Sequence, residues 1–120
     1  FDDPNYGVEL GYAIGNTTQT QTISAAAGES ILFHNYDTIP HTASFLGDAT
    51  MNNAPWPQSF SGGMTASPSG TAIGTSGFST GTIAAGKNSA YYETGVPGFY
   101  MIGDGYDYNA HKMRTVIVVH

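Results

Sequence analysis

The chain has 120 residues, of which 9 are Asp or Glu and only 3 are Lys or Arg, so its formal net charge is -6 at pH 7. This length predicts one domain spanning residues 1–120, and a hydrophobic share of 40% excludes a disordered chain. The deficit of basic residues argues against nucleic acid as a partner, and the absence of cysteine excludes disulfides, thiolate metal sites and cysteine nucleophiles.

The strand-like period dominates the chain, because apolar residues alternate with small or polar ones in most segments. In chain order, the predicted strands lie at residues 8–14, 18–23, 30–35, 43–46, 77–83, 98–102 and 113–119. Residues 23–33 and 83–92 form two similar corners, each with an Ala-Ala-Gly turn. Residues 47–75 predict a long irregular loop rich in Pro, Gly, Ser and Thr, and residues 1–6 an extended or disordered tail. Seven to eight short strands without a helical stripe predict an all-β sandwich or barrel.

No apolar run approaches the roughly 18 to 20 residues that a membrane-spanning helix needs, so we do not expect the chain to span a membrane. Because the chain begins at Phe1 rather than Met, we expect that any secretory signal has been removed. A chain poor in Lys and rich in Gly, Ser, Thr and Tyr, with an acceptor pattern for glycosylation at Asn16, indicates an extracytoplasmic location: periplasmic, cell-surface or secreted.

Two segments carry side chains that bind metals. His41 follows Pro40 in a tight turn between two predicted strands, where an imidazole would be well fixed as a ligand; a surface histidine is the alternative. The second segment precedes the last predicted strand and contains two carboxylates, an imidazole and a thioether: Asp104, Asp107, His111 and Met113. Carboxylates favour hard ions, imidazole suits Cu(II) and Zn(II), and Met favours Cu(I). An ordinary polar turn is the alternative for this segment.

Taken together, these segments resemble the cupredoxins, the small blue copper β-sandwiches of the plastocyanin, azurin and rusticyanin class. The resemblance extends from about residue 20 to residue 119. It depends on Asn-Tyr-Asp-Thr-Ile-Pro-His-Thr-Ala-Ser-Phe at 35–45, Thr-Gly-Val-Pro-Gly-Phe-Tyr-Met at 94–101 and Met-Arg-Thr-Val-Ile-Val-Val at 113–119. It implies a Greek-key β-sandwich, with His41 at the position of the first copper ligand and Met113 at that of the axial ligand.

The chain departs from this family at two of the four ligand positions. Asp104 occupies the position of the ligating cysteine, and Asp107 that of the second histidine. Without the thiolate, the resemblance does not imply a blue site or conventional electron transfer, so we expect no redox partner. His111 lies two residues before Met113, and in an extended segment both side chains would point to one face. The predicted site therefore contains His41, Asp104 and His111, supplemented by Asp107 or Met113.

Two functions follow from this sequence. The first is an extracytoplasmic cupredoxin-fold protein with a non-blue metal site, type-2-like for copper, with zinc as the second choice. The second is a metal-free structural or self-assembling extracellular subunit, in which residues 1–6 add as a strand to the sheet edge of another copy and produce a homo-oligomer. We expect no enzyme, because the sequence has neither a Ser-His-Asp order nor a nucleophile elbow.

Overall fold

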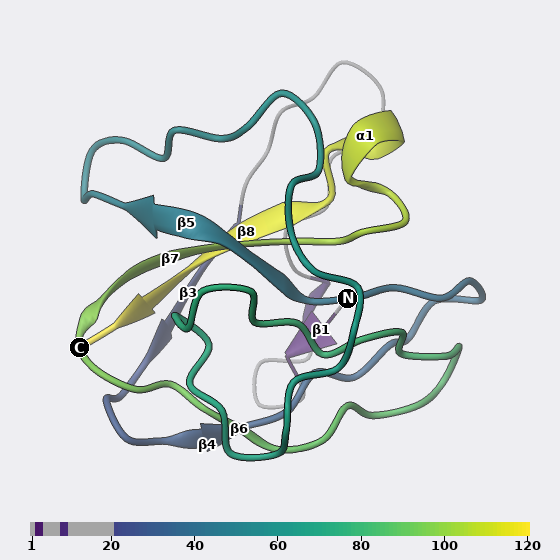
Figure 1. The fold of residues 1–120 in the computed structure, drawn as a ribbon, viewed down its shortest axis with the longest axis horizontal. Helices are drawn as coiled ribbons and strands as arrows, with labels where there is room; N and C mark the ends of the chain where they lie inside the picture. Colours follow the sequence, from purple (N-terminus) through teal and green to yellow (C-terminus); the bar gives the residue numbers. More distant parts are fainter. Residues whose placement is uncertain (1, 4–7, 10–20) are drawn as a thin grey trace.

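The computed structural model describes residues 2–3, 8–9 and 21–120, and the regular secondary structure of this part of the chain is almost entirely β-strand (Figure 1). Its elements are β1 (Asp2–Asp3), β2 (Val8–Glu9), β3 (Gln21–Ala25), β4 (Ser30–Ile31), β5 (Ser44–Ala49), β6 (Tyr92–Glu93), β7 (Gly98–Gly103), α1 (Tyr108–His111) and β8 (Arg114–Val119). The all-β prediction is therefore confirmed.

The main sheet has four strands in the order β3-β8-β7-β5. Its centre includes β8, whose Val-Ile-Val-Val run consists of β-branched residues that favour a pleated, half-buried surface. β3 runs parallel to β8, with Ile23 opposite Ile117, whereas β7 is antiparallel to both β8 and β5. A register shift between Phe45 and Gly47 bends β5, and Gly47 tolerates its φ of 132° because it has no β-carbon.

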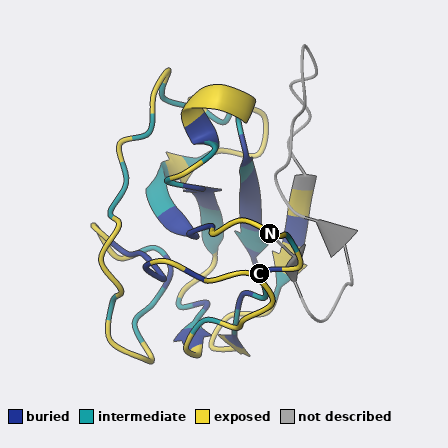
Figure 2. Ribbon diagram, turned by 90° about the vertical axis from the view of Figure 1, so that its right-hand side faces the viewer, coloured by how far each residue is buried: buried dark blue, intermediate teal, exposed yellow. Residues whose placement is uncertain are grey.

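A second layer lies against this sheet and contains the antiparallel pair β4 and β6, seen below the large sheet in Figure 1. Much of this layer is irregular chain rather than strand. The buried apolar cluster between the layers includes Ile23, Phe33, Ile73, Phe78, Ile83, Tyr92, Ile102, Met113 and Ile117. Buried positions gather on the central strands, while many of the connecting loops are exposed (Figure 2). The core therefore fixes the strand ends from which the site residues project.

The predicted strand at 77–83 is wrong, because the structure has only isolated bridges there, Ser79 with Ser44 and Ile83 with His41. The physical reason lies in its side chains and glycines. The Thr80 hydroxyl accepts the Ala43 N–H at 2.9 Å in place of a backbone carbonyl. Gly81 has a φ of 65°, which a strand does not allow. The segment still follows the sheet edge, but its polar side chains replace part of the hydrogen-bond ladder.

The polar loop predicted between the last two strands contains a short helix, α1. Tyr108 anchors this helix because its ring is fully buried. The helix ends at Lys112, which adopts the left-handed conformation with φ 55° and donates its backbone N–H to the Tyr108 carbonyl. The prediction that residues 111–113 are extended, with His111 and Met113 on one face, is therefore wrong.

The N-terminal predictions are covered only in part. β1 pairs antiparallel with β2 within the chain, Asp2 opposite Glu9 and Asp3 opposite Val8. The rest of the predicted tail, most of the predicted strand at 8–14 and the Asn16 acceptor pattern lie outside the described residues. Within the described ranges, no helix has the length and apolar character needed to cross a membrane.

Candidate metal centre

The turn that leads into His41 is held by Asn35, which lies at the start of that turn and is fully buried. Its side-chain amide donates to the carbonyls of Ile39 at 2.8 Å and Ile83 at 2.9 Å. Its side-chain oxygen accepts the backbone N–H of Asp37 at 2.8 Å. Three hydrogen bonds from one buried side chain thus fix the turn, and the adjoining backbone bridge to Ile83 fixes His41.

The imidazole of His41 is fully buried and lies between two carboxylates. Nδ1 is 2.8 Å from Asp104 Oδ2, and Nε2 is 2.9 Å from Asp37 Oδ2. Ionised carboxylates only accept hydrogen bonds, so two of them at these distances suit a ring that donates from both nitrogens, the imidazolium form. Such a ring would place one positive charge between two negative groups.

Asp104 follows directly after β7 and is fully buried. Its Oδ1 accepts the Thr42 backbone N–H at 2.5 Å, and its Oδ2 accepts the Asp107 backbone N–H at 2.9 Å as well as the bond from His41. The backbone N–H of Asp104 donates to the Met113 carbonyl at 3.1 Å. The Thr42 N–H, the Asp107 N–H and the His41 ring thus donate to one carboxylate, which offsets the cost of burying its charge and fixes its orientation.

Asp107 lies one turn further along and extends the cluster toward the surface. Its side chain is 13% exposed, with Oδ2 3.9 Å from His41 Nδ1. Its Oδ1 accepts a hydrogen bond from His111 Nδ1 at 3.1 Å, across one turn of α1. One donor atom each from His41, Asp104 and Asp107 lie within 4.8 Å of one another, so the three side chains form a group that could hold a metal ion.

The other two predicted ligands occupy different environments. His111 is 47% exposed on the side chain and contacts the cluster only through Asp107. Met113 is buried in the apolar core, and its backbone carbonyl is bonded to Asp104. The structure therefore brings His41, Asp104 and Asp107 together, while metal ligation by His111 and by the Met113 sulfur stays a prediction.

The charges around His41 set its protonation. Burial by itself lowers the pKa of His41, but the hydrogen bonds to Asp104 and Asp37 outweigh it, so the pKa of this imidazole is raised above its ordinary value. The hydrogen bond from His41, followed by that from the Thr38 backbone, holds the pKa of Asp37 below its ordinary value. Both shifts favour the charged form of the group concerned, as the attraction between the ring and the carboxylates requires.

Asp37 is the member of this site that the sequence analysis missed. Its only sequence signal is its position four residues before His41, in a polar turn. In the structure, Asn35 Oδ1 accepts the Asp37 N–H in an Asx turn, and the Asp37 carboxylate accepts the Thr38 N–H at 2.6 Å. Polar residues are expected in any turn, so this pattern alone does not mark a functional residue. Only the fold shows that the carboxylate reaches the far nitrogen of the buried ring.

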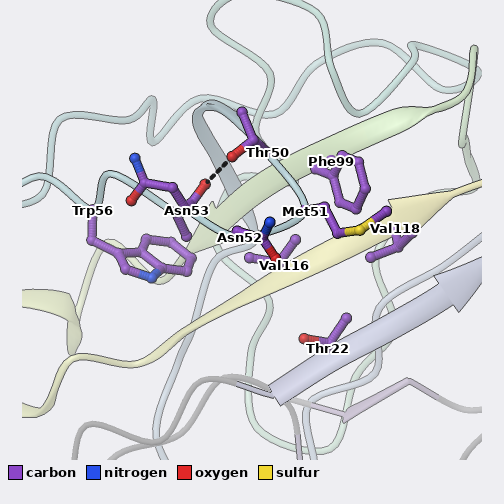
Figure 3. A pocket seen from close by; sticks show the side chains of 10 residues that line it. Thr22, Thr50, Met51, Asn52, Asn53, Trp56, Phe99, Val116 and Val118 are labelled. Atoms are coloured by element: carbon purple, nitrogen blue, oxygen red, sulfur yellow. Dashed lines mark hydrogen bonds between the residues drawn. The ribbon is translucent and has the colours of Figure 1, made fainter.

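A groove of about 230 Å³ lies on the outer face of the main sheet, away from this cluster. Figure 3 shows the turn at 50–53 with Trp56 to its left, Phe99 and Val118 to its right and Val116 below it. None of the residues around His41 lines it. His41 and Asp104 are instead fully buried, so they belong to a packed polar site.

Comparison with known proteins adds no family to this geometry. A scan against models of protein families and a search of curated proteins both found no match. The resemblance to cupredoxins therefore stays a prediction that depends on the residues themselves.

The raised pKa of His41 predicts how the stability of the metal-free protein depends on pH. The ion pair stabilises the fold fully below the unfolded pKa of about 6.5, and this contribution is lost as pH rises through the higher folded value. In the presence of a chelator, urea unfolding should show a fall in the free energy of unfolding across that window. His41→Gln should abolish this fall, and an equal fall in the variant would contradict the assignment.

Proposed function

We propose that this chain is an extracytoplasmic cupredoxin-fold protein that binds one divalent metal ion at a non-blue site, with His41 as the anchor ligand and Asp104 and Asp107 as its partners. The proposal depends on the convergence of their donor atoms within 4.8 Å. Ligand bonds of roughly 2.0–2.2 Å place the donors of one ion about 3–4 Å apart. His41 Nδ1 and Asp107 Oδ2, 3.9 Å apart, already have this spacing, whereas His41 Nδ1 and Asp104 Oδ2, 2.8 Å apart, would have to separate slightly to admit an ion. The role proposed is metal binding and not catalysis.

The ends of the strands support both the site and the fold assignment. Register places Ser44, the first residue of β5, opposite Gly103, the last residue of β7, and Gly103 is also opposite Arg114, the first residue of β8. Asp104 and Met113 immediately adjoin two of these ends, and His41 lies three residues before the third. The ligand positions implied by the cupredoxin resemblance therefore meet at one end of one sheet, as a shared site requires.

Asp37 provides the outer partner that histidine ligands usually have. A ligating imidazole commonly donates its second N–H to a carboxylate, which fixes the tautomer and the ring orientation. His41 donates Nε2–H to Asp37 and directs Nδ1 toward Asp104. Nδ1 is therefore the nitrogen available to a metal, while Asp37 remains outside the coordination shell.

The proton on Nδ1 occupies the place that a metal ion would take. It carries the positive charge between His41 and Asp104, and a ligating imidazole must lose it. Metal binding would thus exchange one proton for a dication among three carboxylates, those of Asp37, Asp104 and Asp107. The neighbouring negative charges favour this exchange, and acid opposes it.

The donor set selects among ions. One imidazole with two carboxylates gives nitrogen and oxygen donors, which suit Cu(II) in a tetragonal site and also Zn(II). The chain has no cysteine, so the thiolate that colours a blue site is absent. We propose Cu(II) as the preferred ion and Zn(II) as the second.

The first test is direct metal binding. Asp104→Asn and Asp107→Asn each remove one anionic ligand, so Cu(II) affinity by calorimetry should fall by more than the roughly 10–100-fold typical of outer partners. Electron paramagnetic resonance should show a type-2 spectrum in the wild-type protein. Affinity should also weaken as pH falls through the raised pKa of His41, which lies above the ordinary value of about 6.5, because protons then compete for Nδ1.

Asp48→Asn is the matched control, because Asp48 is an exposed carboxylate on β5 outside the cluster. This variant should bind Cu(II) like the wild-type protein. Asp107 is partly exposed, so Asp107→Asn also keeps the test valid if Asp104→Asn fails to fold. If the wild-type protein binds no more tightly than His41→Ala, the metal proposal is wrong.

A constructive variant tests the residue correspondence with the family. Asp104→Cys together with Asp107→His would place a thiolate and a second imidazole near His41 Nδ1. Adding Cu(II) should then produce the intense blue absorption of a restored His₂Cys site, checked by visible spectroscopy. The single variant Asp107→His should stay non-blue. A folded double variant that binds copper without colour would show that the correspondence is misaligned.

A second candidate function is a metal-free, self-assembling extracellular subunit, and one observation favours it. The buried cluster is fully hydrogen-bonded without a metal, because His41 uses both nitrogens and Asp104 accepts three bonds. A site abandoned by metals could persist as such a network. In this function, the N-terminal strand would pair with another copy.

Deleting residues 1–6 tests this second function. β1 pairs with β2 in the single chain, and a second copy could offer the same two residues in exchange. If strand exchange builds an oligomer, light scattering coupled to size-exclusion chromatography should show a smaller species after the deletion. An unchanged mass would count against strand exchange. Val8→Pro keeps residues 1–6 but weakens the pairing of β1 with β2, so it is the matched variant.

A further inference from the structure

Residues 57–64, within the long irregular loop, run alongside the segment that carries Asp104 and Asp107. We call residues 57–64 the strap and residues 104–112 the ligand turn. Four kinds of contact join them: hydrogen bonds at one end, an aromatic contact in the middle, van der Waals contact at a glycine, and a chain of hydroxyl groups at the other end.

The first contacts involve α1 and the start of the strap. The Tyr108 hydroxyl donates to the Pro57 carbonyl at 2.5 Å, and Lys112 Nζ donates to the Gln58 carbonyl at 2.8 Å. Tyr108 is fully buried, so its bond is shielded from water and fixes the helix against the strap.

The middle of the strap is held by Phe60. Its backbone N–H donates to Asn109 Oδ1 at 2.7 Å, and its ring lies 6.2 Å from that of Tyr108, centroid to centroid. Further along, Met64 covers Gly105, where an added β-carbon would lie 1.9 Å from the Met64 sulfur. The residue next to Asp104 is therefore a glycine on which the strap packs directly.

Three buried hydroxyls join the far end of the strap to the site, and the direction of each hydrogen can be assigned. Ser44 must donate to the Gly63 carbonyl at 2.6 Å, because a carbonyl only accepts. Its single proton is then used, so Thr42, at 3.0 Å, and Ser79, at 2.9 Å, donate to Ser44. Thr42 in turn accepts the Gly105 N–H at 2.9 Å. A continuous chain thus runs from Gly105 through Thr42 and Ser44 to Gly63.

We propose that the strap is a positioning element for the metal site, which holds Asp104 and Asp107 in place before an ion binds, with Tyr108 as its principal anchoring residue. The proposal rests on the metal site proposed above and gives a role to the start of the irregular loop. The ligand turn is tied to it near its start, at Gly105 through hydroxyls, and directly in its middle at Tyr108 and at its end at Lys112. A carboxylate pair held at fixed separation loses less freedom when it binds an ion.

Tyr108→Phe tests this role, and Tyr92→Phe is its matched control. Tyr92 is also buried and donates its hydroxyl to a backbone carbonyl, that of Ser67 at 2.9 Å, but Ser67 lies outside the strap. Zn(II) is the probe, because it is redox-silent and does not depend on a d-electron geometry. Tyr108→Phe should raise the Zn(II) dissociation constant about 10-fold, as loss of an outer partner does, whereas Tyr92→Phe should leave it unchanged.

A second variant and a second readout keep the test decisive. Asn109→Ala removes the acceptor of the Phe60 N–H from an exposed position, so it should fold and also weaken Zn(II) binding. Trp56, the chain's one tryptophan, precedes the strap and lies 4.7 Å from the Arg114 guanidinium. Its fluorescence should become more accessible to acrylamide in Tyr108→Phe than in Tyr92→Phe.

The outcomes separate the two proposals. If the wild-type protein binds Zn(II), and the affinity falls equally in Tyr108→Phe and Tyr92→Phe or falls in neither, the positioning role of the strap is wrong and the metal site stands. A wild-type protein that binds Zn(II) and Cu(II) no better than Asp104→Asn overturns the metal site, and the strap's positioning role with it. Weaker binding in Tyr108→Phe and Asn109→Ala, with Tyr92→Phe unchanged, supports both.

Discussion

The hydrogen bond between His41 and Asp104 is the interaction on which the site depends. It joins residues 63 positions apart, one just before β5 and the other just after β7, and both side chains are fully buried. Removing His41 would leave the buried Asp104 carboxylate without its counterion, which typically costs about 3–5 kcal/mol. The pair therefore fixes the end of the sheet where it lies, and the register of β5 against β7 brings its two halves together.

The same side chains could hold either a proton or a metal ion between them. With a proton on Nδ1, His41 neutralises one carboxylate on each side of its ring. With a divalent ion in that place, the ring stays oriented by Asp37, and Asp107 adds the second anionic donor. The metal-free network is thus compatible with both functions, because a site that binds a cation by exchange must satisfy its own charges when the cation is absent.

Part of this arrangement could be predicted from the sequence, and the rest required the fold. Alternation and β-branched residues identified β7 and β8, and the resemblance brought His41 and Asp104 to one site. The helix at Tyr108 escaped prediction because four residues are too few for a periodic stripe. Asp37 escaped because its role depends on the direction in which a buried ring points. The strand predicted at 77–83 failed because hydroxyl groups took over backbone hydrogen bonds that periodicity alone assigns to a ladder.

The aspartate at position 104 also changes what its neighbours require. A carboxylate has two oxygens and accepts from Thr42, Asp107 and His41 at once, whereas a thiol is only a weak acceptor. A cysteine at this position would leave the two backbone N–H groups poorly paired unless a metal or a rearranged turn compensated. The contacts of the strap with Gly105 and Tyr108 restrict such a rearrangement. The turn is therefore adapted to a carboxylate, and any ion that binds here must accept oxygen donors in the positions that this packing sets.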